Sequence, residues 1–280
     1  MGTGWIQMKT RSNIQASIGI FDSGVGGLTV FRRIEEALPH ESLVYLGDTA
    51  RVPYGSKSGA TVVRYAKACA KLLLQRDIKM LVVACNTASA YALDALRDNL
   101  DIPVIGVIEP GAKAACRHTQ TGRVGVIGTR GTISTGSYEK IIRQLRPDCL
   151  VYSKACPLFV PFAEEGWTSG PAIHEIAETY LGGLLKNEID TLVLGCTHYP
   201  LLSDVIAKVA GKAVTLVDSA GETARAVAAT LEASELVNTP AARGALSFLV
   251  TDGHTHFREM GEQFLGHPLD TVEWVDVQEI

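Results

Sequence analysis

The chain has 280 residues, of which 46% are hydrophobic and 20% are charged, and its formal net charge is −4. This composition is typical of a folded globular protein and excludes a disordered chain, while the acidic balance gives no electrostatic reason to expect nucleic acid or an anionic membrane as a partner. A chain of this length exceeds one ordinary hydrophobic core, so we expect two packed domains.

The first residues carry no targeting signal that the sequence reveals. Residues 1–16 lack the apolar centre of a secretory signal and are predicted to be a tail or an expression tag. No apolar run approaches the roughly 18 residues that a membrane span needs. We therefore expect a cytoplasmic protein, with no membrane partner, whose 6 cysteines are reduced thiols at irregular spacings.

Short apolar segments alternate along the chain with longer segments of helical periodicity. The short segments are apolar throughout, which is typical of parallel strands that helices cover on both faces. The sequence therefore predicts an α/β fold with mainly parallel sheets. The expected strands are 17–21, 43–46, 80–84, 104–107, 124–127, 191–194 and 214–217, with further strands at 248–250 and 271–275. The expected helices between and after them are 59–75, 88–99, 172–186, 221–233 and 254–265.

Two strand-and-loop signatures recur in the same order and at similar spacing. Leu-Val-Val-Ala-Cys-Asn-Thr at 81–87 returns as Leu-Val-Leu-Gly-Cys-Thr-His at 192–198, and Ile-Gly-Ile-Phe-Asp-Ser at 18–23 resembles Val-Gly-Val-Ile-Gly-Thr at 124–129. We therefore predict two similar domains, flanked by helices and related by a pseudo-twofold axis. The first would comprise residues 17–109 plus 219–280 and the second residues 110–218, with the active site between them.

Two cysteines, Cys85 and Cys196, each follow an apolar strand and precede a helical pattern. Loops at the carboxyl ends of parallel strands line ligand crevices, so two facing halves would bring these cysteines to opposite sides of a ligand. The N-terminus of a helix favours a thiolate, which would make either cysteine a base. Three alternatives stand beside this hypothesis: buried apolar residues, a cysteine nucleophile with a histidine base, and metal ligands, for which the spacing is poor.

A glycine-rich turn, Phe-Asp-Ser-Gly-Val-Gly-Gly at 21–27, joins the first strand to a helix. It differs from a nucleotide-binding loop because Thr29 stands where the third glycine would be, and the chain contains no Gly-Lys-Ser/Thr. We expect its backbone amides to approach a small anion such as a carboxylate, while Asp22 holds an ammonium group or a thiol proton. A helix N-cap is the alternative role for Asp22.

Other polar side chains follow strands near the same crevice. In the loop 47–55, Tyr54 and Gly55 are expected to touch the ligand, although such a loop is often only a surface connection. Thr129 and Thr132 supply hydroxyls from the second half, or act as caps. The glutamates at 164–165 lie in an apolar stretch, where one carboxylate would point inward or both would be solvated. The histidines at 254 and 256 are assigned to a surface turn with no role.

Four motifs in their order and spacing resemble those of bacterial glutamate racemases. They are Gly-Ile-Phe-Asp-Ser-Gly-Val-Gly-Gly at 19–27, Gly-Asp-Thr-Ala-Arg-x-Pro-Tyr-Gly at 47–55, Ala-Cys-Asn-Thr-Ala at 84–88 and Leu-Gly-Cys-Thr-His-Tyr-Pro-Leu at 194–201. The likeness runs from about residue 18 to about residue 275. It implies glutamate as the substrate between two α/β domains, neither pyridoxal phosphate nor a metal, and supply of D-glutamate for peptidoglycan synthesis, cell wall biogenesis and cell shape. Dimers are common in that family, so a homodimer is the assembly that the resemblance suggests.

The resemblance also implies a role for each matching residue. Cys85 would take the α-proton from D-glutamate and Cys196 from L-glutamate, and the opposite cysteine would return a proton. Asp22 would assist Cys85, while His198 and Glu164 would assist Cys196. The charged groups of the substrate would be held by Asp22, Ser23, Tyr54, Gly55, Asn86, Thr87, Thr129, Thr132, Thr197 and His198.

Other functions stay open at this stage. A racemase of aspartate or another amino acid would share the layout with two cysteines, and a cysteine-nucleophile hydrolase or lyase would use either cysteine alone. A binding role has no charged patch or amphipathic stripe to favour it. Because a site between domains must open to admit a substrate, we also expect the domains to close on it.

Overall fold

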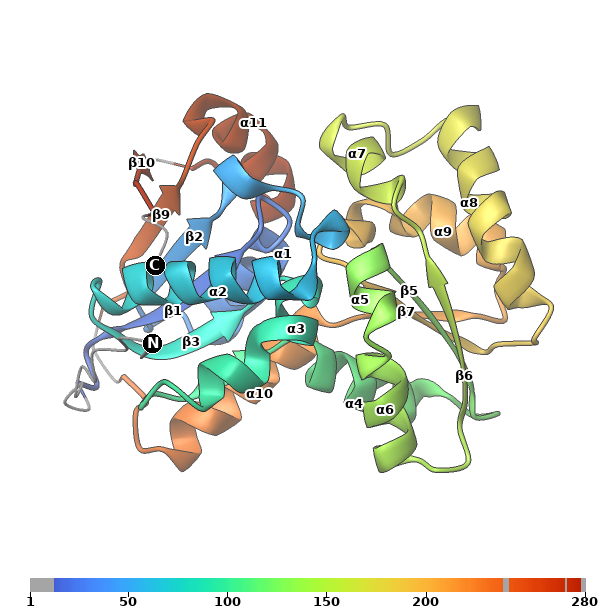
Figure 1. Cartoon of the computed structure of the whole chain (residues 1–280), viewed down its shortest axis with the longest axis horizontal. Coiled ribbons are helices and arrows are strands. Elements are labelled where there is room, and N and C mark those ends of the chain that lie inside the picture. Colours follow the sequence, from blue (N-terminus) through green and yellow to red (C-terminus); the bar gives the residue numbers. More distant parts are fainter. Residues whose placement is uncertain (1–12, 239–241, 270, 278–280) are drawn as a thin grey trace.

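The computed structural model describes residues 13–238, 242–269 and 271–277, and its strands form two parallel sheets in separate lobes (Figure 1). The six-stranded sheet has the order β10-β9-β2-β1-β3-β4, and the four-stranded sheet has the order β6-β5-β7-β8. The first contains β1 (Ser17–Asp22), β2 (Leu43–Gly47), β3 (Ile78–Val83), β4 (Val104–Gly106), β9 (Leu246–Val250) and β10 (Val272–Trp274). The second contains β5 (Arg123–Gly128), β6 (Leu150–Ala155), β7 (Thr191–Gly195) and β8 (Thr215–Asp218).

Helices cover both faces of each sheet, as their buried side chains show. In the six-stranded sheet, α1 (Leu28–Ala37), α10 (Ala220–Ala233) and α11 (His254–Leu265) cover one face, and α2 (Gly59–Leu74) and α3 (Asn86–Arg97) cover the other. In the four-stranded sheet, α7 (Phe159–Glu164), α8 (Pro171–Leu185) and α9 (Ser203–Ala210) lie on one face, and α4 (Ile108–His118) and α6 (Ser137–Leu145) on the other. The short helix α5 (Arg130–Ser134) follows β5 directly. This double cover explains why the strand segments are apolar throughout.

The strand order repeats between the two sheets. The order β2-β1-β3-β4 in one sheet corresponds to β6-β5-β7-β8 in the other, and neighbouring strands run parallel in both. The two halves of the sequence repeat, at 18–23 with 124–129 and at 81–87 with 192–198, therefore fall on equivalent strands. The predicted α/β class with parallel sheets flanked by helices is confirmed.

The structure differs from the sequence prediction where polar residues interrupt the apolar pattern. β6 was not predicted, because it is an edge strand whose side chains are mostly exposed or half-buried. β3 begins at Ile78 rather than at residue 80, since the buried ammonium of Lys79 lies 2.6 Å from the Glu41 carboxylate and donates to two backbone carbonyls. Cys196 precedes a 3₁₀ turn (Tyr199–Leu202) instead of an α-helix.

Two predictions about chain organisation stay predictions. Of the proposed tail 1–16, residues 1–12 lie outside the described residues, while Ala16 is buried and the Ile14 carbonyl accepts a hydrogen bond from Lys79. The division into 17–109 plus 219–280 and 110–218 is supported by packing, since α10 belongs to the core around β1 and α4 to the core around β5. Within the described residues, no helix is long and apolar enough to cross a membrane.

Candidate active site

The two cysteines lie at the carboxyl ends of equivalent strands. β3 ends at Val83 and β7 at Gly195, so that Cys85 and Cys196 occupy the loops that follow, and both side chains are buried. Asp22 ends β1, the strand beside β3. Because carboxyl ends of parallel strands share one edge of a sheet, Asp22 and Cys85 are neighbours at that edge.

Cys85 is the N-cap of α3 and is held by the glycine-rich turn. Its Sγ accepts a hydrogen bond from the Ala88 backbone N–H at 3.4 Å and lies 3.7 Å from the Ser23 hydroxyl. Burial, reinforced by the negative charge of Asp22, raises the pKa of Cys85 to about 12, although its hydrogen bonds with Ala88 and Ser23 oppose the shift. Desolvation thus outweighs the helix N-terminus in this structure and favours the thiol form of Cys85, and the thiolate expected during catalysis stays a prediction.

Cys196 has a different set of partners. Its Sγ lies 3.8 Å from His198 Nδ1, and His198 Nε2 lies 3.0 Å from the Glu164 carboxylate at the end of α7. Burial alone would lower the pKa of His198, but the hydrogen bonds to Cys196 and Glu164 raise it to about 10. His198 is thus an imidazolium near neutral pH and places positive charge beside the Cys196 sulfur.

The charge of His198 predicts a pH-dependent contribution to stability. A pKa raised from 6.5 to about 10 in the folded protein means that the stabilisation is complete below pH 6.5 and is lost as the pH rises to 10. We expect the free energy of unfolding of the parent to exceed that of His198→Asn most at pH 6 to 6.5, and the difference to shrink toward pH 10. Urea unfolding of both proteins across this range measures it, and a difference independent of pH would contradict the assignment.

Direct hydrogen bonds join the two halves around the cysteines. Thr197 Oγ1, next to Cys196, donates to Asp22 Oδ1 at 3.4 Å, and the other Asp22 oxygen accepts from the Gly24 N–H at 2.9 Å. Asp22 is fully buried, and this burial raises the pKa of its carboxyl while the charge of His198 and these hydrogen bonds oppose the shift. The alternative role of Asp22 as a helix N-cap is wrong, because Gly27 is the N-cap of α1 and no side chain caps that helix. Asp22 instead accepts a hydrogen bond within the glycine-rich turn and contacts Thr197 beside Cys196.

Three threonine hydroxyls form a cluster where the two halves meet near the start of α3. Thr87 Oγ1 of α3 is 2.9 Å from Thr129 Oγ1 and 3.2 Å from Thr132 Oγ1, both from the second half. Thr129 also accepts a hydrogen bond from the Thr132 N–H as the N-cap of α5, so the predicted capping role is present as well. The three hydroxyls donate and accept among themselves, which leaves them free to reorient toward an anionic group.

The predicted ligand contacts Tyr54 and Gly55 lie in different surroundings. The Tyr54 hydroxyl donates to the buried Asp48 carboxylate, which also accepts from Arg51 and Thr251. The Tyr54 side chain is therefore directed into a structural cluster, and contact from this loop with a ligand would come from the backbone. At Gly55 the backbone approaches so closely that an added Cβ would lie 2.5 Å from the Thr129 Cβ.

Tyr138 is a residue near the site that the sequence did not predict, whereas the paired glutamates and the histidines near 254 were considered there. Tyr138 of α6 donates a hydrogen bond of 2.7 Å to the Asn86 amide oxygen, a contact that no sequence motif indicated. Glu165 is exposed, whereas Glu164 points inward, so the paired glutamates separate as one of the two readings predicted. The histidines at 254 and 256 are exposed in the first turn of α11.

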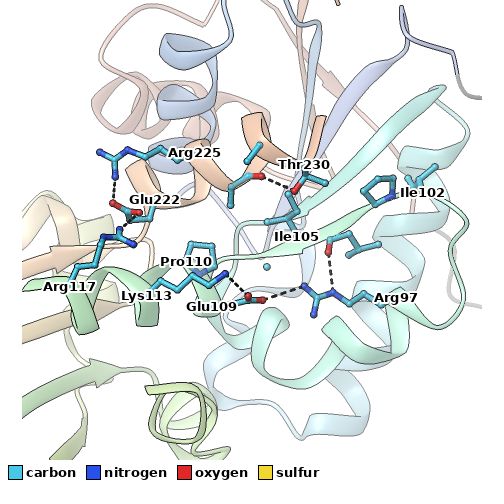
Figure 2. Close-up of a pocket in the computed structure, with 15 residues that line it drawn as sticks. Arg97, Ile102, Ile105, Glu109, Pro110, Lys113, Arg117, Glu222, Arg225 and Thr230 are labelled. Carbon is cyan, nitrogen blue, oxygen red and sulfur yellow. Dashed lines mark hydrogen bonds and ion pairs between the residues drawn. The ribbon is translucent and has the colours of Figure 1, made fainter. Parts of the chain in front are cut away.

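One cavity borders the predicted site, and a larger one lies elsewhere. A small cavity of about 170 Å³ is bordered by Glu164 and by Gly24 and Val25 of the glycine-rich turn. A larger cavity of about 860 Å³ between β4, α4 and α10 is lined by none of the predicted site residues, and its arginines and lysine pair with Glu109 and Glu222 (Figure 2). In the part of the chain that the structure describes, no group of three or more His, Cys, Asp or Glu side chains is arranged to bind a metal ion.

Comparisons with known proteins place this fold among the amino-acid racemases. The family model for Asp/Glu/hydantoin racemases matches residues 18–227. A glutamate racemase of Geobacter metallireducens is 55% identical over 262 residues, which cover 94% of this chain and 97% of the relative. The chain belongs to the Asp/Glu/hydantoin racemase family.

Solved structures agree over the whole fold. The crystal structure of a glutamate racemase from Bacillus anthracis superposes with a TM-score of 0.91 at 41% identity, covering 95% of this chain and 99% of that one. The glutamate racemase of Francisella tularensis, crystallised in complex with D-glutamate, gives a TM-score of 0.90 at 38% identity, covering 96% of this chain and 100% of that one.

Proposed function

We propose that this chain interconverts L-glutamate and D-glutamate by two-base proton transfer without a cofactor. The observation that carries the proposal is the pair of buried cysteines on equivalent strands, each with its own partners. Inversion needs acid–base groups on opposite faces of the α-carbon, because a single base tends to return the proton to the face it left. In this proposal Cys85 serves one face and Cys196 the other.

The two cysteines have different charged neighbours. Burial raises the pKa of Cys85, which keeps it a thiol able to give a proton, while the His198 imidazolium lies beside Cys196. We infer that the resting enzyme holds one thiol and one thiolate, set by the enantiomer that it last released. In the L-to-D direction Cys196 takes the α-proton and Cys85 delivers a proton, and the reverse reaction exchanges the two roles.

Removal of the α-proton also requires stabilisation of the charge that develops on the substrate carboxylate. The buried donors near Cys85 support this step. The Asn86 amide nitrogen is buried with no hydrogen-bond partner, and the hydroxyls of Thr87, Thr129 and Thr132 form a cluster nearby. We propose that these groups, together with Ser23, Thr197 and the backbone at Gly55, hold the charged groups of glutamate.

Glutamate is the substrate that the relatives support. The similar proteins are named glutamate racemases, and one of the similar structures contains D-glutamate. We propose that the D-glutamate made here supplies peptidoglycan synthesis in the cytoplasm, and that the chain assembles as a homodimer.

Racemisation of L-glutamate in deuterated water, with no added cofactor, tests the function. We expect deuterium at the α-carbon together with loss of optical activity, because each turnover replaces the substrate proton with one from a cysteine that exchanges with solvent. A panel that includes L-aspartate identifies the preferred amino acid, and faster turnover of L-aspartate would favour the rival racemase. A covalent adduct that accumulates in the mass spectrum, without α-deuteration, would instead indicate a cysteine nucleophile.

A further inference from the structure

The side-chain amide of Asn86 has a hydrogen-bond partner for its oxygen and none for its nitrogen. It is the first residue of α3, directly after Cys85, and only 3% of its surface is exposed. Its oxygen accepts the 2.7 Å hydrogen bond from the Tyr138 hydroxyl, while its nitrogen makes no hydrogen bond. A buried amide donor without a partner is costly, so it points to a ligand group that it serves.

We propose that Tyr138 is a positioning residue that turns the Asn86 amide so that its N–H groups face the substrate, an inference that rests on the proposed glutamate racemisation. The two orientations of an amide side chain differ by an exchange of oxygen and nitrogen in nearly the same volume. A hydroxyl that donates to the oxygen selects one of them. Tyr138 thereby reserves the nitrogen of Asn86 for an acceptor such as a carboxylate.

The surroundings of Tyr138 keep its hydroxyl in the donor role. The side chain is 3% exposed, and burial raises its pKa far above the ordinary value for tyrosine, so it stays protonated. A Cβ added at Gly111 of α4 would lie 3.1 Å from the Tyr138 hydroxyl. Glycine at this position therefore leaves enough space for the hydroxyl.

The hydrogen bond also links the two halves of the protein. Tyr138 lies on α6, which covers the four-stranded sheet, and Asn86 lies on α3, which covers the six-stranded sheet. It can form only when the halves are packed as they are here. The orientation of a substrate-facing donor in one half is thereby set by a residue of the other half.

Tyr138→Phe removes only the hydroxyl and tests the inference. We expect kcat/KM for glutamate to fall roughly 5- to 100-fold, the range for leaving a buried polar group wrongly paired. The matched control is Tyr91→Phe, because the Tyr91 hydroxyl also bridges the halves, 2.9 Å from Ser134 Oγ, without touching Asn86. Tyr91→Phe is expected to keep the parent kcat/KM, and thermal unfolding shows whether each variant is folded.

A double-mutant cycle separates positioning from general stability. If Tyr138 acts through Asn86, adding Tyr138→Phe to Asn86→Ala lowers kcat/KM no further, whereas a purely structural role makes the two losses multiply. A Tyr138→Phe variant with parent kcat/KM, or losses that multiply, would overturn the inference.

A spectroscopic readout works without turnover. In a spectrum of protein labelled with ¹⁵N-asparagine, the side-chain signal absent from Asn86→Ala identifies Asn86. Tyr138→Phe should shift that signal and Tyr91→Phe should leave it in place; an unmoved signal would contradict the hydrogen bond. If Tyr138→Phe shifts the Asn86 signal as expected but the parent protein does not racemise glutamate, the proposed function is overturned while the orientation of the amide stands.

Discussion

Replacement of either Cys85 or Cys196 by serine is expected to lower the rate of racemisation roughly 10²- to 10⁴-fold, the usual contribution of a positioned acid–base group. A serine hydroxyl fills nearly the same volume but neither loses nor accepts a proton as a thiol does. The two variants should differ in isotope exchange. Cys196→Ser keeps the base proposed for D-glutamate and should exchange only the α-proton of that enantiomer, whereas Cys85→Ser should exchange only that of L-glutamate.

The matched control for the cysteine variants is Cys116→Ser. Cys116 is a half-buried thiol on α4, away from both site cysteines, and should tolerate the change with the parent rate. Chiral chromatography and mass spectrometry of the product in deuterated water measure inversion and exchange together. If either site variant racemises glutamate as fast as the parent, the two-base mechanism is wrong.

Gly26→Ala is expected to lower kcat/KM about 10²-fold while the protein stays folded, because a shift of about 1 Å in the reacting groups has that effect. Gly26 lies in the glycine-rich turn of one half, against the loop after Cys196 in the other. An added Cβ would lie 2.5 Å from Thr197 Oγ1 and 2.6 Å from His198 Nδ1. The methyl group must displace these side chains or separate the halves, and either outcome disturbs the partners of Cys196.

Gly182→Ala provides the comparison for Gly26→Ala. Gly182 lies in α8, and nothing would approach an added Cβ there within 4 Å. Alanine at this position should leave kcat/KM unchanged and stabilise the protein slightly through its higher helix propensity. Steady-state kinetics with urea unfolding separates the two effects, and a Gly26→Ala enzyme with parent kcat/KM would show that the close packing at Thr197 and His198 is dispensable.

Local sequence determined most helices and strands, and it identified the strands that are followed by the candidate site residues. The apolar strands β1 and β7 and the helix α11 appear within a residue of their predicted bounds, because burial on both faces and helical periodicity are encoded over short distances. The repeat of Cys85 and Cys196 was visible for the same reason. A cysteine that ends an apolar run in a parallel sheet must lie at its carboxyl edge.

Only the tertiary structure decided how these elements meet. Tyr138 reaches Asn86 across 52 residues, and Glu164 reaches His198 across 34, so no local pattern links either pair. The direction of the Tyr54 hydroxyl was likewise set by Asp48, and the high pKa of Cys85 by burial that a helix N-terminus does not reveal. Sequence therefore determined which residues lie at the carboxyl ends of the strands, whereas packing of the two halves decided their partners and orientation, because those depend on contacts and desolvation between distant segments.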